Sequence, residues 1–185
     1  MNNLYPVVRA MGYFERMKIM TVIYETNTGF TEKYAKAFAE KHGLECWNTY
    51  MAKIKVKRKS DVIYFGWVQA GQIQGFKKAR KRYNILAVCP VGLTEPNDER
   101  KAKLIELNSI SDMQVFPLRG GYDDDKMTGA AGLLISMIRT EFEDRTKKGE
   151  ELKPAEKEMY EDLQNGADYF SEDNLAAVDE WFNAI

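Results

Sequence analysis

The sequence predicts an α/β fold built on a doubly wound, five-stranded parallel sheet. Apolar runs of strand length alternate along the chain with segments of helical periodicity, which is the pattern of such a sheet. The third run, residues 61–65, has four successive apolar positions after one acid, as expected for a central strand covered on both faces. Glycine-containing segments follow several of these runs, at the strand ends where open α/β sheets bind ligands.

The composition fits one globular domain. The chain has 185 residues, of which 44% are hydrophobic and 30% are charged, so it can form a sizeable core. Its formal net charge of −1 gives no strong field that would favour nucleic acid or a membrane surface. No apolar run reaches the length of a membrane span. The two cysteines, Cys46 and Cys89, form no CxxC motif and favour a reduced, cytoplasmic protein over a disulfide scaffold.

Residues 1–16 precede the first predicted strand. They show neither a long apolar core nor a cleavage site of small residues, so they do not resemble a signal peptide. We therefore expect an N-terminal extension of residues 1–16, packed on the surface or disordered, followed by one domain of residues 17–185.

A hydroxyl-rich turn joins the first predicted strand, residues 18–24, to the first predicted helix, residues 31–41. The turn reads Thr26-Asn27-Thr28-Gly29-Phe30-Thr31. The first N–H groups of a helix lack internal partners, and the helix dipole adds about half a positive charge there. With three Thr hydroxyls and the permissive Gly29, the turn is suited to one phosphate group held by neutral donors. The alternative is an ordinary turn in which Thr and Asn side chains cap the helix.

Several other site classes are excluded by the same residues. The turn has neither the GxxxxGK[ST] motif of a nucleoside triphosphatase nor the GxGxxG motif of a dinucleotide fold. The single histidine, His42, precedes Gly43 at a predicted helix end, and no cluster of metal ligands accompanies it. We therefore predict no metal site and no catalytic residue of the protein itself.

The turn resembles the FMN phosphate loop of flavodoxins, whose pattern is [ST]-x-T-G-x-T. The sequence matches this pattern at Thr26, Thr28, Gly29 and Thr31. The resemblance implies a flavodoxin-like fold of strand order 2-1-3-4-5 and FMN as the cofactor. Soluble flavodoxin carriers are typically much more acidic than this chain, which favours a role beyond that of a plain carrier.

The second strand is predicted over residues 44–49, and a basic segment follows it. Residues 53–59 contain five Lys or Arg in seven positions. A short, solvated connection explains such a segment, and a docking patch for an acidic partner or an anionic lipid is the alternative.

Two further loops are expected at the carboxyl ends of strands. Residues 66–72 follow the third strand, and residues 90–96 follow the fourth strand, predicted over residues 84–89. Both loops resemble flavin loops of the flavodoxin-domain family that includes menaquinone-dependent protoporphyrinogen oxidase. Trp67 can stack on the flavin ring or pack as core, and it stands where that family usually has a small residue. Helices are predicted over residues 76–83 and 96–107 beside these strands.

The last third of the chain is expected to hold a helical insertion. The fifth strand, residues 113–118, contains Pro117 and should therefore be an edge or bulged strand. The resemblance implies an insertion over residues 124–171, and its helix over residues 127–142 is apolar beyond one stripe. That helix meets either a second subunit, a protein partner or a quinone donor, or else the rest of the insertion. A closing helix is predicted over residues 174–185, with Asp173 as its cap.

The resemblance implies an FMN site made by four segments. The phosphate is expected on residues 26–31 and the ring between residues 66–72 and 90–94, with acids after the fifth strand lowering the flavin potential. Two functions stay open: electron transfer with a redox partner protein or quinone, or oxidation of the protein's own substrate. The candidate cofactor-binding residues are Thr26, Asn27, Thr28, Gly29, Phe30, Thr31, Gly66, Trp67, Val68, Gln69, Ala70, Gly71, Pro90, Val91, Gly92, Leu93, Gly121, Tyr122 and Asp123.

Overall fold

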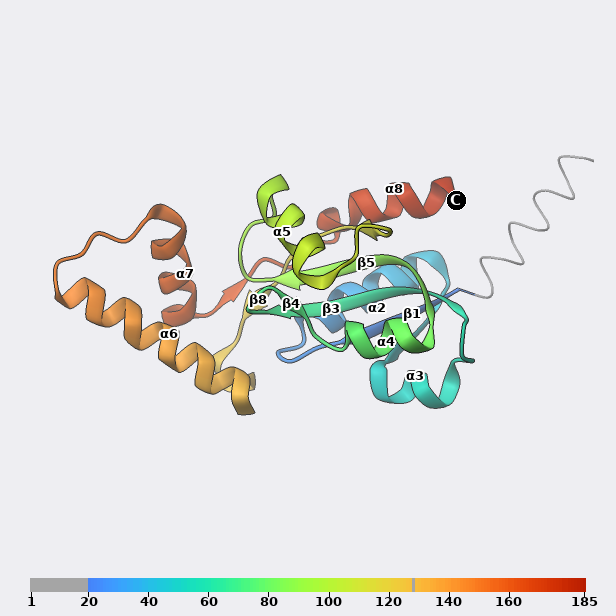
Figure 1. Cartoon of the computed structure of the whole chain (residues 1–185), viewed down its shortest axis with the longest axis horizontal. Helices are drawn as coiled ribbons and strands as arrows, with labels where there is room; N and C mark the ends of the chain where they lie inside the picture. The colour runs from blue at the N-terminus through green and yellow to red at the C-terminus, as the bar shows by residue number, and fades with distance from the viewer. Residues whose placement is uncertain (1–19, 128) are drawn as a thin grey trace, which may run out of the picture.

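The computed structural model describes residues 20–127 and 129–185, and the predicted extension, residues 1–16, lies outside them. The central sheet has the strand order β2-β1-β3-β5-β6, and neighbours in this order pair in parallel. The fold is thus the predicted doubly wound, flavodoxin-like α/β fold (Figure 1). These strands are β1 (Thr21–Glu25), β2 (Glu45–Asn48), β3 (Asp61–Gln69), β5 (Asn84–Gly92) and β6 (Gln114–Val115).

Helices cover both faces of this sheet because successive strand residues point to opposite sides. In β1, Val22 belongs to one apolar core and Ile23 to the other. The first core includes residues of α2 (Phe30–His42) and α8 (Ala176–Ala184). The second core includes residues of α3 (Thr49–Lys55), α4 (Phe76–Arg82) and α5 (Asp98–Asn108).

The predicted loop of residues 66–72 is wrong, because the strand continues through most of it. β3 runs to Gln69 and pairs with the antiparallel β4 (Gln72–Ile73), and Ala70 and Gly71 form the turn with positive φ angles of 47° and 75°. A Cβ on Gly66 would lie 2.6 Å from Ile73 Cγ2, so glycine there lets β4 fold onto β3. Likewise, β5 extends through residues 90–92 of the second predicted loop.

Pro117 divides the predicted fifth strand, as its missing N–H suggests. β6 ends at Val115, and β7 (Leu118–Arg119) resumes the pairing with β5 after the proline. The predicted short connection after β2 is partly helical, since α3 begins there with the Asn48 side chain accepting a hydrogen bond from Met51 N at 2.8 Å.

The insertion folds back on itself and returns to the sheet. Its segments are a 3-10 helix (Asp124–Lys126), α6 (Gly129–Lys147), α7 (Pro154–Asn165) and β9 (Ala167–Asp168). β9 pairs with β8 (Gly121–Tyr122), which directly precedes the insertion. α6 and α7 project beyond the sheet (Figure 1) and share a small core around Phe142 and Leu163. The alternative in which the insertion covers its own apolar helix is therefore confirmed for one face, whereas Leu133 and Met137 remain exposed.

The closing helix is held against α2 by a buried acid. Asp179 Oδ1 lies 2.7 Å from His42 Nε2, and its Oδ2 lies 2.7 Å from Lys41 Nζ. The predicted cap of this helix is wrong, because Leu175 stands at the N-cap position of α8 and no side chain caps it. Ser171 caps the 3-10 helix before α8, and its hydroxyl accepts a hydrogen bond from Asp173 N at 3.2 Å. The chain enters α8 through the 3-10 helix Glu172–Leu175.

Candidate functional site

The turn between β1 and α2 leaves the helix N-terminus without a side-chain cap. Gly29 occupies the N-cap position with φ 97°, which favours glycine, and no side chain accepts a hydrogen bond from the first turn of α2. Thr26 Oγ1 instead accepts from Gly29 N at 3.1 Å, within the turn itself. The first N–H groups of α2 thus remain available, which disagrees with the ordinary capped turn and suits an anion.

Two Thr hydroxyls of this turn are also free among the described residues. Thr28 and Thr31 line the adjoining cleft, and neither hydroxyl makes a hydrogen bond to another described residue. Thr31 is nearly fully buried in the wall of the cleft. Asn27 Nδ2 donates to Met127 Sδ at 2.8 Å and fixes the start of the insertion beside the turn.

A cleft of about 290 Å³ opens from this turn. Its floor is made by the turn and the ends of β3 and β5, at the carboxyl edge of the sheet. One side of α6, together with Met159 of α7, forms a roof of aliphatic side chains. The cleft therefore joins free hydrogen-bond donors at one end to an apolar slot, which suits a flat organic ring carrying one phosphate.

Most of the predicted site residues meet at this cleft. It is lined by Asn27, Thr28, Phe30, Thr31, Trp67, Val68, Gln69, Ala70, Gly71, Val91, Gly92, Leu93, Gly121 and Tyr122. Thr94, the last residue of the predicted ring segment 90–94, also lines the cleft. Sequence reasoning did not assign the roof residues to the site: Met127, Ala131, Leu134, Ile135, Ile138 and Met159. The apolar excess of the predicted helix over residues 127–142 was the signal for most of this roof.

Five predicted site residues do not line the cleft. Thr26 and Gly29 shape the turn, Gly66 accommodates β4, and Pro90 faces a neighbouring cavity. Asp123 lines a separate cavity together with Asp124 and Asp125.

The acidic cluster is partnered away from the cleft. Asp123 pairs with Lys126, whose hydrogen bond lowers the pKa of that carboxyl. Asp124 accepts hydrogen bonds from Tyr122 and Arg139, which lower its pKa. The expectation that these acids lie beside a flavin ring and lower its potential is thus not supported by their positions.

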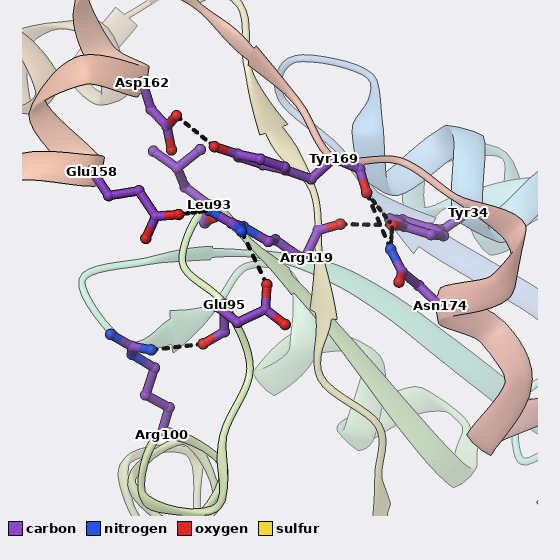
Figure 2. A network of polar contacts seen from close by, with 9 residues as sticks. All are labelled: Tyr34, Leu93, Glu95, Arg100, Arg119, Glu158, Asp162, Tyr169 and Asn174. Carbon is purple, nitrogen blue, oxygen red and sulfur yellow. Dashed lines mark hydrogen bonds and ion pairs between the residues drawn. The ribbon is translucent and has the colours of Figure 1, made fainter. Parts of the chain in front are cut away.

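A polar network around Arg119 joins the insertion to the sheet (Figure 2). The Arg119 guanidinium binds Glu95 at 3.0 Å and Glu158 of α7 at 2.7 Å, and lies 3.4 Å from the ring centre of Tyr169. Its backbone carbonyl accepts a hydrogen bond from Tyr34 of α2 at 2.6 Å. One residue of β7 therefore ties α2, the loop after β5 and α7 together, and so fixes the roof above the floor.

A second cavity, of about 310 Å³, adjoins the cleft behind the β3–β4 hairpin. The two share five wall residues: Val68, Ala70, Gly71, Gly92 and Thr94. The second cavity adds apolar groups from α5, such as Leu104 and Leu107, and the cations Arg100 and Lys103. The two cavities therefore lie next to each other at the carboxyl edge of the sheet.

Neither cysteine is suited to thiol chemistry. Burial raises the pKa of Cys46 to about 12 and that of the fully enclosed Cys89 well above its usual value. Because only the thiolate reacts readily, we expect both thiols of the folded protein to react with a disulfide reagent at pH 8 at least about 100-fold more slowly than in the unfolded chain. Timed absorbance assays with and without guanidinium measure this, and a native Cys46 as fast as the unfolded thiol contradicts it.

No group of acidic, His and Cys side chains that could hold a metal ion occurs in the described part of the chain. Within the same residues, none of the helices combines the length and apolar character that a membrane span requires. The chain matches no protein-family model and no curated protein. Its likeness to flavodoxins is thus carried by the fold and by the turn at residues 26–31.

Proposed function

We propose that this protein binds FMN in the cleft at the carboxyl edge of the sheet and functions in electron transfer. The observation that carries the proposal is the uncapped N-terminus of α2, with the free hydroxyls of Thr28 and Thr31, at one end of an apolar cleft. The phosphate would accept hydrogen bonds from these hydroxyls and from the first N–H groups of α2. Neutral donors suffice for a single terminal phosphate that stays partly hydrated.

The remaining cleft residues would position the ring and exclude water. Trp67 lines the cleft, and residues Leu134, Ile135 and Ile138 of α6 cover it. Backbone groups of β5 and of the β3–β4 hairpin can hydrogen-bond the polar edge of the ring. FMN, when bound, supplies the electron-transfer chemistry, and the protein sets its environment.

The residues that line the cleft give little support for acid–base catalysis by the protein. Tyr122 is the one ordinarily titratable side chain among them, and burial and its hydrogen bond to Asp124 raise the pKa of Tyr122 to about 12. It therefore stays neutral near pH 7 and acts as a packing and hydrogen-bonding group. This fits a protein whose chemistry belongs to its cofactor.

An FMN-dependent oxidoreductase of the protoporphyrinogen oxidase type, acting on its own substrate, is the second candidate. The adjoining cavity favours it, because an organic molecule held against Leu104 and Leu107 would lie beside the FMN cleft. Anaerobic incubation of the FMN-loaded protein with protoporphyrinogen and a menaquinone analogue separates the two. Turnover without any added protein indicates the enzyme, and none indicates the carrier.

Partners and location follow from the same proposal. Leu133 and Met137 are exposed on α6, which could meet a second copy of the chain, a redox partner or a quinone donor. Both cysteines are free, which fits a reduced cytoplasmic setting. Sedimentation of the wild type against a Leu133→Glu variant tests the homodimer.

Removing one phosphate donor tests the FMN site directly. We expect Thr28→Ala to weaken FMN binding by about 1–3 kcal/mol, because a phosphate oxygen loses its hydrogen bond. The control is Thr140→Ala, since the Thr140 hydroxyl bonds Ser136 O at 2.9 Å on the exposed side of α6. Flavin fluorescence titration measures both, and equal affinities for the two variants would place the phosphate elsewhere.

A further inference from the structure

One surface of the molecule concentrates the positive charge of the chain. Residues 53–82 contain ten Lys or Arg and one Asp, a net charge of +9, so the rest of this chain of net charge −1 carries −10. These residues include the end of α3, the segment 56–60, β3, β4 and α4. We call the surface formed by α3, residues 56–60 and α4 the basic face.

The cations of the basic face are largely unneutralised. Among described residues, only Arg80 of the ten forms an ion pair, with Asp112 at 3.0 Å. Arg82 instead donates to Lys53 O at 2.7 Å and to the Tyr83 hydroxyl at 3.1 Å, and so joins α4 to α3. The two helices therefore present their charge as one rigid surface, and an acidic partner would meet little competition from the protein's own acids.

The basic face is hollowed where it meets the candidate FMN cleft. A cavity of about 350 Å³ is lined by Lys53, Lys78 and Arg82. Glu25 is the one acid in its wall, and its carboxylate already accepts a hydrogen bond from the Thr49 hydroxyl. Trp67 lines this cavity and the FMN cleft alike, and it is the one residue that the two walls share.

Apolar side chains lie exposed among these cations. Tyr50 is 70% exposed and Ile54 66% exposed, one turn apart on the short helix α3. Protein interfaces combine an apolar centre, often with Tyr, and a charged rim that steers association. An amphipathic helix that lies on a membrane is typically much longer than the seven residues of α3.

We propose that the basic face docks the acidic surface of an electron-transfer protein, with Tyr50 and Ile54 at the centre of the contact and Lys53, Lys78 and Arg82 around it. The inference rests on the proposed function and deepens it, because the cavity of the basic face and the FMN cleft share the wall residue Trp67. A compact acidic protein fits better than a nucleic acid or a membrane. Those extended polyanions would also face the remainder of the chain, whose net charge of −10 repels them.

Two small haem proteins of opposite charge serve as probes: the acidic soluble domain of cytochrome b5 and the basic cytochrome c. Calorimetric titration of the full chain needs no flavin, so it is independent of the FMN proposal. At about 10 mM salt we expect the acidic probe to bind at least about tenfold more tightly than the basic one. Its affinity should fall at least about tenfold when the salt concentration is raised to about 200 mM.

Charge-reversal variants locate the contact. The double variant Lys53→Glu, Lys78→Glu should weaken binding of the acidic probe at least about tenfold. The control is the double variant Lys147→Glu, Lys148→Glu, which makes the same change of charge at the end of α6. It should change the affinity for the acidic probe less than about threefold. Tyr50→Ser should weaken it at both salt concentrations, because its contact is apolar. Melting curves verify that each variant is folded.

Three results would overturn the proposal. The first is equal binding of the two probes, and the second is an equal loss in both double variants. The third is that the protein binds vesicles containing phosphatidylserine through Lys53 and Lys78 but does not bind the acidic probe. That result would make the basic face a membrane contact. If the protein does not bind FMN but binds the acidic probe as expected, the proposed function is rejected and the docking surface stands.

Discussion

Replacing Phe182 by alanine is expected to lower the free energy of unfolding by about 3–5 kcal/mol. Phe182 is fully buried on α8, with its ring centre 5.5 Å from that of Phe38 and 4.5 Å from that of His42. Truncation removes these contacts and leaves a cavity between α8 and α2, beside the Asp179 contacts that hold the two helices together.

Denaturant unfolding followed by circular dichroism measures this loss. Ile185→Ala at the end of the same helix is the matched control, because Ile185 is 45% exposed and should cost less than about 1 kcal/mol. Equal losses for the two variants would contradict the packing of α8 against the sheet. FMN affinity of the folded fraction should not change, since Phe182 does not line the cleft.

Replacing Ala131 by tryptophan is expected to weaken FMN binding by more than about 100-fold, equivalent to roughly 2.7 kcal/mol. Ala131 is buried on the side of α6 that roofs the cleft. An indole there would occupy the space in which the proposed ring lies, and a cleft of about 290 Å³ has little room to spare.

The neighbouring Ala130 provides the control. It is exposed and does not line the cleft, so Ala130→Trp makes the same change in the same helix turn without filling the site. Fluorescence titration of both variants, with melting curves as a check of folding, measures the difference. Retained FMN affinity in Ala131→Trp would remove α6 from the site.

The fold could be predicted because its signals are local. The run at residues 61–65 and the turn at residues 26–31 carry their patterns within a few positions, and alternation of strands and helices specifies a parallel sheet. The extension of β3 was missed because it depends on pairing with β4. That pairing is supported by Asn108 Oδ1, 35 residues away, which accepts from Ile73 N at 2.9 Å.

The roof of the site could be predicted only in part. The apolar excess of residues 127–142 indicates a contact, yet the side of α6 that meets the cleft depends on how the insertion packs against the sheet. Arg119 holds the insertion to the sheet through its contacts with Glu158 and Tyr169. The spacing of these three residues in the sequence does not indicate that they meet. The position of Asp123 after the fifth strand predicts it in the site, but it lines a separate cavity, where Lys126 binds it.

Titration of the wild-type protein with FMN and with riboflavin tests the central claim most directly. The two ligands share the ring and differ by the phosphate, so their difference reports the turn at residues 26–31. We predict saturable quenching of flavin fluorescence at one FMN per chain, with a Kd below about 1 μM, and binding of riboflavin at least about tenfold weaker. A protein that stays colourless and quenches neither flavin, or one that binds both equally well, would contradict the account.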